Sequence, residues 1–286
     1  MGMTGAGKTS FIKEITGLDM EVGHTLEACT KEIHVATITI NGQVVRFIDT
    51  PGFDDTDMKD TDILRAIGTY LSGSNIENLR LAGILYLHRI TDVRMGGTAL
   101  KNLRMFKTLV GDHNMSNVIL LTTMWSNLQP SENGEKRLDE LIETHKFWGG
   151  MIASGATHER YHGTKADAYR IITPMLENAP VFLQLQEELA NGTKLAETTA
   201  GKQVNESLEL LQVRHAEEMA MLKKEITEAS QAENGKLRQE LQDRHEDLLE
   251  EQQKVVEAQK RLYEVEIEVL KGRVAELENK SSCIVC

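Results

Sequence analysis

Cysteine, proline and long apolar runs are all scarce in this sequence. Its three cysteines, Cys29, Cys283 and Cys286, are too few and too scattered for a disulfide framework. No cationic and then apolar signal peptide opens the chain, and no stretch approaches the roughly 18 apolar residues of a membrane-spanning helix. These absences exclude disulfide-stapled secreted scaffolds and membrane-spanning proteins, and we expect a soluble cytoplasmic protein.

An excess of basic residues is also missing. The chain has 32 Lys and Arg against 44 Asp and Glu, a formal net charge of −12. Nucleic-acid binding needs a basic surface that displaces counterions from phosphates. The sequence therefore predicts no nucleic-acid partner.

Composition changes near residue 180. All four prolines and both tryptophans lie at or before that position, while residues 181–286 have 14 basic against 22 acidic residues and carry −8 of the net charge. We therefore expect a globular domain at 1–180, a helical connector at 181–203, a long helix at 204–280 and a short tail at 281–286.

The first 180 residues alternate between β-branched runs and helical patterns, which is typical of βαβ units around a mainly parallel sheet. Helices are expected at 8–16, 60–71, 98–110, 135–145 and 167–175. Strands are expected at 33–40, 44–48, 81–87, 117–121 and 151–153, with Asn41-Gly42 as a hairpin turn between the first two. The pattern predicts a three-layer α/β sandwich.

Apolar residues beyond residue 203 recur at helical, heptad-like spacing, as in Ile267, Leu270, Val274 and Leu277. A helix this long needs a partner to bury its apolar stripe, which favours a coiled coil and self-association through it. A single solvated helix with many i,i+4 ion pairs is the alternative.

A glycine-rich motif opens the chain. It matches G-x-x-x-x-G-K-[ST] in full and is followed by a helical pattern. Glycines let the backbone N–H groups wrap a phosphate, the lysine neutralises the β- and γ-phosphates, and the threonine hydroxyl ligates Mg²⁺. The motif predicts these nucleotide-binding residues: Gly2, Met3, Thr4, Gly5, Ala6, Gly7, Lys8, Thr9 and Ser10.

A second motif, Phe47-Ile48-Asp49-Thr50-Pro51-Gly52, follows about 40 residues later at the end of a predicted strand. There, Asp49 can hold a Mg²⁺-bound water and the Gly52 N–H can sense a γ-phosphate. Between the motifs, Thr25 and Thr30 are candidates to close over Mg²⁺, and Thr30 is favoured. We assign catalytic roles to Lys8 and Thr30.

With GMTGAGKTS, the threonine-containing loop, FIDTPGFDD and the long tail, residues 1–180 resemble the translation-factor-related P-loop GTPases. The similarity is to the branch that contains septins, chloroplast import receptor GTPases and immunity-associated (AIG1-type) GTPases. This resemblance implies a GTPase domain that uses Mg²⁺ and GTP.

The base-reading motif of that family, [NT]-K-x-D, is expected after the strand at 117–121. Here the segment is Thr122-Thr123-Met124-Trp125-Ser126, so Ser126 replaces the guanine-binding aspartate. Thr123 and Ser126 remain nucleotide-binding candidates, Trp125 either stacks on the base or packs, and ATP stays open beside GTP. A loop at 153–156 is a weak candidate for a second base contact through backbone N–H groups.

Two further departures concern hydrolysis and the sheet. Phe53 stands where Ras-like GTPases have a water-positioning glutamine, so slow intrinsic hydrolysis is expected. The polar neighbours Asp54, Asp55 and His24 are weaker candidates for that role. The family's first strand, which precedes the P-loop in the middle of the sheet, is absent from this sequence.

The chain ends in Cys283-Ile284-Val285-Cys286, which fits the C-a-a-X pattern although a terminal cysteine is unusual. Prenylation of Cys283 would tether the protein to a membrane, and a pair of exposed thiols is the alternative.

The leading hypothesis is a GTP-dependent switch with slow hydrolysis, self-associating through its head and coiled coil and signalling to an unidentified effector. The alternatives are a coiled-coil scaffold with a degenerate nucleotide-binding head, and an ATPase of the same fold.

Overall fold

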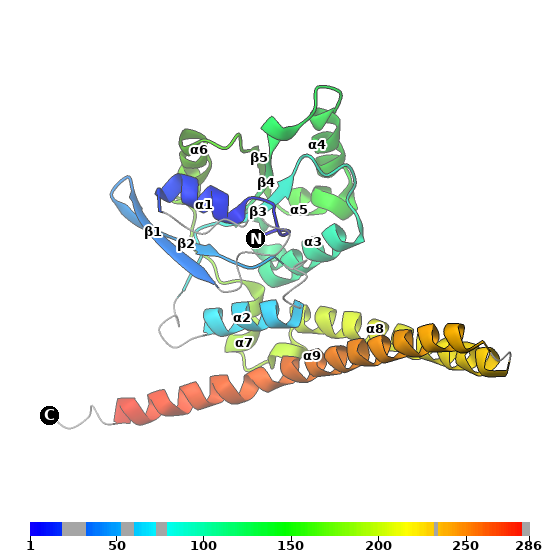
Figure 1. The fold of residues 1–286 in the computed structure, drawn as a ribbon. Coiled ribbons are helices and arrows are strands. Elements are labelled where there is room, and N and C mark those ends of the chain that lie inside the picture. The colour runs from blue at the N-terminus through cyan, green and yellow to red at the C-terminus, as the bar shows by residue number, and fades with distance from the viewer. Residues whose placement is uncertain (19–32, 53–59, 73–78, 232–233, 282–286) are drawn as a thin grey trace.

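The structure is a computed structural model that describes residues 1–18, 33–52, 60–72, 79–231 and 234–281. The elements of the first 180 residues are α1 Lys8–Thr16, β1 His34–Ile40, β2 Gln43–Asp49, α2 Asp60–Ser72, β3 Ile84–Arg89, α3 Gly97–Val110, β4 Val118–Thr123, α4 Gly134–Glu143, α5 Gly150–Ala153, β5 Thr157–Arg160 and α6 Lys165–Met175. The C-terminal helices are α7 Gln184–Ala190, α8 Thr199–Gln231 and α9 Gly235–Ser281. Figure 1 shows the strands between two helical layers, with α8 and α9 beside that domain.

The main sheet is parallel, with strand order β3-β4-β5 and Ile84 opposite Val118 at its start. Successive residues of β3 and β4 point into two different cores. Tyr86 and Leu120 join the cluster on the side of α2, α3 and α4, whereas Leu87 and Leu121 join the cluster on the side of α1 and α6. Burial on both faces explains why these strands are continuous apolar runs, and it confirms the predicted three-layer sandwich.

A separate antiparallel hairpin is formed by β1 and β2, with His34 opposite Asp49. Its turn has positive φ at both Asn41 (49°) and Gly42 (80°), as a two-residue turn between twisted strands requires. The predicted Asn-Gly hairpin is therefore confirmed.

The described strands form two sheets, and among the described residues no strand pairs with both β2 and β3. The first two residues lie along β3 instead. Gly2 pairs in parallel with Leu87, and the Leu87 N–H donates to the Met1 carbonyl at 2.9 Å.

The expected strand at 151–153 is wrong. These residues form the last turn of α5, and the strand begins four residues later as β5. β5 reads Thr-His-Glu-Arg with no apolar residue, because it pairs with β4 alone among the described strands and stays partly exposed. An edge strand of this kind has no run of apolar residues by which it could be predicted from the sequence.

The C-terminal extension consists of two helices, not the single helix expected at 204–280. α8 and α9 run antiparallel, since Asn205 bonds Gln259 and Arg244 bonds Glu218. Apolar residues of both helices, Val204 and Leu208 of α8 and Val255 of α9, lie in one buried cluster. The apolar stripe that predicted a partner is therefore covered within the chain along this part of the hairpin.

α9 also packs against the sandwich through α2 (Figure 1). Ala258 (0% exposed) and Leu262 (1% exposed) belong to the same buried cluster as Ile63 and Leu64 of α2. Beside them, the Arg261 guanidinium donates to both oxygens of Asp62, at 3.1 and 3.2 Å. The C-terminal helix thus contributes to the core of the domain.

Candidate nucleotide-binding site

The glycine-rich loop connects the start of the chain, beside β3, to α1. Gly5 and Gly7 have φ of 73° and 89°, a region that residues with a side chain rarely adopt. Gly2 is buried, and a Cβ there would collide with the carbonyl oxygen of Leu87. These conformations explain the glycine spacing, and they leave the N-terminus of α1 without a side-chain cap. Uncapped N–H groups at a helix N-terminus favour an anion.

Lys8, the first residue of α1, bends back over this loop. Its Nζ donates to the carbonyl oxygens of Gly2 at 3.0 Å and Met3 at 2.9 Å. The ammonium is therefore held against the loop itself, where a phosphate bound by the loop would meet it.

Thr9 and Asp49, which the sequence places 40 positions apart, lie together. The Thr9 hydroxyl donates to Asp49 Oδ2 at 2.6 Å. Asp49 is 1% exposed, and its other oxygen, Oδ1, has no hydrogen-bond partner among the described residues. An orphaned carboxylate oxygen beside a threonine hydroxyl is a set of hard oxygen donors that fits Mg²⁺.

The structure describes only some of the other predicted site residues. Ser10 is exposed on α1, and Gly52 is buried three residues after Asp49. The remaining candidates lie outside the described residues: Thr25 and Thr30 for the metal, Phe53, Asp54, Asp55 and His24 near the hydrolytic water, and Cys283 for lipidation.

Thr123, at the end of β4, braces the loop. Its buried hydroxyl lies 3.0 Å from the carbonyl oxygen of Ala6 and 3.3 Å from that of His88, and it donates to these two acceptors. Thr123 thus ties β4 to both the P-loop and β3. In this geometry its hydroxyl positions the loop and is not directed at a nucleotide.

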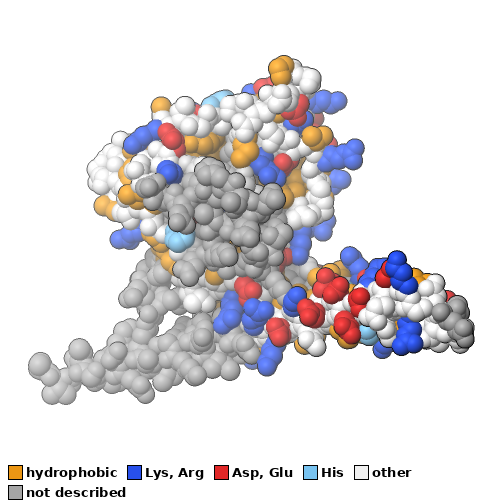
Figure 2. Space-filling view, viewed as in Figure 1, with side chains coloured by type: hydrophobic (Ala, Val, Ile, Leu, Met, Phe, Trp, Pro, Cys, Tyr) orange, Lys and Arg blue, Asp and Glu red, His pale blue; other side chains and the backbone are white. Residues whose placement is uncertain are grey.

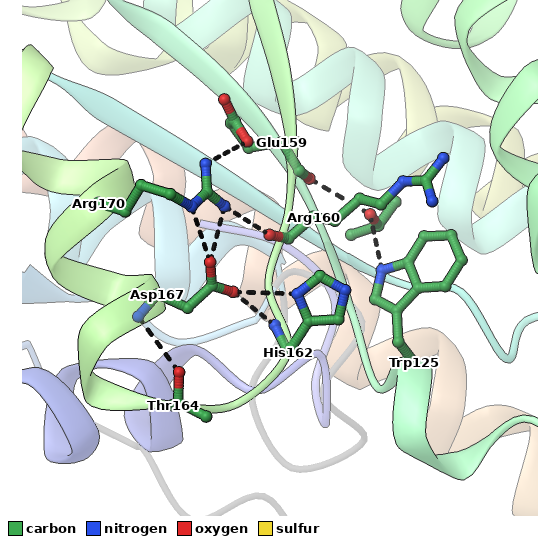
Figure 3. A network of polar contacts seen from close by, with 8 residues as sticks. Trp125, Glu159, Arg160, His162, Thr164, Asp167 and Arg170 are labelled. Atoms are coloured by element: carbon green, nitrogen blue, oxygen red, sulfur yellow. Dashed lines mark hydrogen bonds and ion pairs between the residues drawn. The ribbon is translucent and has the colours of Figure 1, made fainter.

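The segment after Thr123 turns sharply. Met124 adopts a left-handed conformation with φ of 62°, and a short 3-10 helix, η3 (Trp125–Asn127), follows it. Ser126 is exposed, and its hydroxyl donates to Asn127 Oδ1 at 3.3 Å. The Trp125 indole N–H donates to Thr122 Oγ1 at 3.1 Å, and Arg160 covers its ring at 4.7 Å (Figure 3). These contacts favour the packing role for Trp125.

The loop at 153–156 lies at the wrong end of β5 for a base contact. It precedes the strand, and Gly155 faces Ser116, which precedes β4. The P-loop lies at the other end of these parallel strands, where Thr123 contacts Ala6. The loop that follows β5 is 161–164, and sequence reasoning missed it because it placed the strand too early.

Residues 161–164 lie beside the P-loop helix. The Tyr161 N–H donates to the Thr122 carbonyl at 2.9 Å, and the Tyr161 ring packs edge-on against Phe11 of α1 with centroids 4.9 Å apart. Burial raises the pKa of the Tyr161 phenol to about 12, so it stays protonated at neutral pH. The next residue, His162, is exposed, and its ring centroid is 6.4 Å from that of Trp125.

Sequence reasoning also missed Arg89, which ends β3. Its Nε lies 3.0 Å from Asp92 Oδ1, and its Nη1 would lie 3.3 Å from a Cβ on Gly5. A second cation therefore stands beside the P-loop. Its place at the carboxyl end of a buried parallel strand was the available signal.

Comparison with known proteins agrees with this geometry. Residues 1–121 match the family model described as 50S ribosome-binding GTPase. GTP-binding protein A of Dictyostelium discoideum is 26% identical over 168 residues, covering 54% of this chain and 36% of that protein. The tRNA modification GTPase MnmE of Parabacteroides distasonis is 29% identical over 86 residues, covering 30% and 18%. The chain therefore spans about a third or less of each of these relatives.

Two solved structures of Toc33 from Arabidopsis thaliana are also similar. The complex with GDP and Mg²⁺ has a TM-score of 0.48 at 16% identity, covering 64% of this chain and 85% of Toc33. The complex with Mg²⁺ and GMPPNP has a TM-score of 0.48 at 17% identity over the same shares. The sequence match over residues 1–121, which include the P-loop and Asp49, makes this part of the chain similar to GTPases.

Proposed function

We propose that this protein binds Mg²⁺·GTP at the P-loop, hydrolyses it slowly and acts as a nucleotide-dependent switch. The observation that supports this most strongly is the pairing of Thr9 with the buried Asp49, whose second oxygen is unpartnered among the described residues. Burying a carboxylate without a full set of partners is costly, and the arrangement is explained if a cation shares the site.

Each residue of this site has one task. The P-loop N–H groups and the N-terminus of α1 bind the phosphates, and Lys8 moves its ammonium from the loop carbonyls to the phosphate oxygens. Thr9 and Asp49 hold Mg²⁺, with Thr30 or Thr25 as a further ligand. When bound, the metal ion neutralises charge on the β- and γ-phosphate oxygens. Hydrolysis is slow because a phenyl ring at position 53 cannot orient water.

The contact between α2 and α9 supports a route from the head to the helical extension. α2 begins eight residues after Gly52, and Asp62 in its first turn bonds Arg261 of α9. A γ-phosphate sensed at Gly52 would shift α2. The helix α9, which is packed on α2, would report that movement to an effector protein.

Self-association through the head and the helical hairpin is part of the proposal. The hairpin presents apolar side chains that its own packing leaves exposed, with Leu210 at 64%, Val213 at 56% and Met221 at 59%. Charged side chains of both signs surround the exposed part of the hairpin (Figure 2). A solution molecular mass of the full chain, measured with GDP and with a GTP analogue, tests this part, and a monomer in both states contradicts it.

Membrane tethering depends on Cys283 alone. No described helix combines the length and the apolar character needed to cross a bilayer. Mass spectrometry of the C-terminal peptide from native material tests prenylation, and an unmodified peptide ending in Cys286 contradicts it.

The second candidate is a scaffold whose head no longer binds nucleotide. It is favoured by the division of the strands into two sheets and by Ser126 at the base-reading position. The intact Lys8, Thr9 and Asp49 favour the switch, since a scaffold has no use for them.

A fluorescence titration with labelled GTP in Mg²⁺ separates these functions. Lys8→Ala removes a charge-assisted contact worth about 1.5–3 kcal/mol, so affinity should fall roughly tenfold to hundredfold. Lys13→Ala on the same helix is the matched control and should bind like the unchanged protein. Chelating Mg²⁺ should also weaken binding. Equal binding by the Lys8 and Lys13 variants would contradict binding through the P-loop, and no binding by any form would favour the scaffold.

A further inference from the structure

We propose that His162, held in place by Asp167, reads the base of the bound nucleotide instead of the carboxylate that is missing at position 126. The site would then take purine nucleotides without sensing the 2-amino group of guanine. This inference rests on the proposed function and adds the class of base that the site accepts.

His162 lies where the base should fall. The loops after β4 and β5 leave the same edge of the sheet, because the strands are parallel and Thr122 pairs with Arg160. Thr123 in the first loop bonds the P-loop, and Tyr161 in the second packs on the P-loop helix. A nucleotide whose phosphates occupy the P-loop would therefore extend its base towards these two loops.

Neither loop offers a carboxylate. Residues 124–129 and 161–164 contain no aspartate or glutamate. The acidic side chains around the described site are already paired. Glu159 and Asp167 pair with Arg170 (Figure 3), and Glu135 pairs with Arg160. Guanine presents two adjacent donors, N1–H and the 2-amino group, which need two acceptors in a row. No carboxylate of these two loops supplies such a pair.

Asp167 sets the orientation of His162. The His162 backbone N–H donates to Asp167 Oδ2 at 2.7 Å, and the ring Nδ1 lies 3.3 Å from the same oxygen. Arg170 donates to the other oxygen, Oδ1, through both Nε and Nη2, at 2.9 and 2.7 Å. Asp167 is also anchored by its own N–H, which donates to Thr164 Oγ1 at 3.2 Å.

The charge of Asp167 fixes which nitrogen of His162 is free. Burial works to raise the pKa of Asp167, but hydrogen bonds from the His162 backbone and from Arg170 outweigh it and leave the pKa below its ordinary value. The carboxylate can only accept, so a neutral His162 keeps its hydrogen on Nδ1 and presents Nε2 as an acceptor. The side chain is 59% exposed, so a base can reach that nitrogen.

A single acceptor distinguishes bases differently from a carboxylate. The imidazole Nε2 can accept one hydrogen bond, from N1–H of guanine or hypoxanthine or from the 6-amino group of adenine. It cannot also accept from the 2-amino group, so removing that group costs the complex nothing. Trp125 borders the loop, and its ring, held by Thr122 and Arg160, limits the space beside His162.

Competition titrations in Mg²⁺ with GTP, ITP, ATP and CTP test this inference, because ITP is GTP without the 2-amino group. The unchanged protein should bind ITP within about threefold of GTP. CTP should bind at least about tenfold more weakly, a difference of about 1.4 kcal/mol, because the single ring of a pyrimidine holds its 4-amino donor closer to the sugar than a purine holds its own donors, and so short of His162. Ser126→Asp introduces the missing carboxylate and should favour GTP over ITP by about tenfold or more.

His162→Ala should weaken all three purine nucleotides by a similar factor, about threefold to tenfold for one lost hydrogen bond. His158→Ala, an exposed histidine on β5, is the matched control and should change nothing. A preference for GTP over ITP of tenfold or more in the unchanged protein would overturn the inference, as would equal binding of CTP. Identical behaviour of the two histidine variants would also overturn it while leaving GTP binding intact. Failure of every nucleotide to bind would instead refute the proposed function.

Discussion

Truncating Leu262 to alanine tests whether α9 is anchored in the core of the α/β domain. Leu262 is 1% exposed and shares its cluster with Ile63 and Leu64 of α2. Buried leucine-to-alanine changes cost about 2–5 kcal/mol, the sum of lost transfer free energy and the cavity left behind. Because α9 lies at the periphery of the domain and can shift into the space, we expect the lower half of this range, about 2–3 kcal/mol.

Urea unfolding followed by circular dichroism measures this cost, and hydrogen exchange locates it. A loss of about 2 kcal/mol should speed exchange of the α9 amides near Ala258 by roughly thirtyfold. Tyr263→Ala is the matched control, because the neighbouring side chain is 51% exposed and its truncation should cost about 1 kcal/mol or less. If the two variants lose the same free energy of unfolding, α9 is not anchored as described.

Three further results are expected. A double-mutant cycle on Arg261 and Asp62, measured by urea unfolding, should give a coupling free energy of only about 0.2–1 kcal/mol, because the two side chains are 35% and 25% exposed. A coupling above that range would mean that the pair is more desolvated than the structure shows. Thr123→Val keeps the shape but removes the donor to Ala6 and His88, so stability should fall by about 1–2 kcal/mol and labelled GTP should bind more weakly; unchanged affinity would show that the P-loop needs no brace. Burial lowers the pKa of His88 to about 4, so between pH 6.5 and 4 the unfolded chain binds a proton that the folded chain does not. The free energy of unfolding should therefore fall by about 3 kcal/mol as the pH drops through that window. His88→Gln should flatten this part of the pH profile, and an identical profile would contradict a buried neutral His88.

The sequence predicted well where local chemistry decides the structure. The bounds of α1 agree with the predicted helix at 8–16, because glycines flank an amphipathic segment on both sides. The Asn41-Gly42 turn was predictable because few other residue pairs tolerate two positive φ angles. The meeting of Thr9 with Asp49 was predicted from the two motifs: Thr9 stands in the first turn of α1 and Asp49 ends β2, and these two ends converge in this fold.

Prediction failed where tertiary context decides. β5 has no apolar residue to mark it, and this single error displaced the second base-contact loop from 161–164 to 153–156. The heptad-like spacing of the C-terminal region was detected, but the same spacing suits a partner in another chain or in the same chain. The break between α8 and α9, next to Gly235, decides that the partner is in the same chain. A single glycine in a helical pattern does not predict that the chain reverses there.

The nucleotide site has a phosphate-binding half, at the P-loop and Asp49, and a base-binding half, at the loops after β4 and β5. Only the base-binding half departs clearly from the family pattern, and the physics of a switch explains why a switch can function with that departure. Tri- and diphosphates differ only at the γ-phosphate, so the discrimination that drives a switch depends on Lys8, Thr9 and Asp49, which are all in place. The base contributes equally to both states, and a contact that binds both states equally shifts no equilibrium. In the proposed switch, serine instead of a carboxylate at position 126 therefore changes which nucleotide is preferred and not whether hydrolysis can shift the equilibrium. Thr123 lies between the phosphate-binding and the base-binding halves, and its hydroxyl donates a hydrogen bond to the P-loop. This contact explains why position 123 still fits the family motif while Ser126, three residues later, does not.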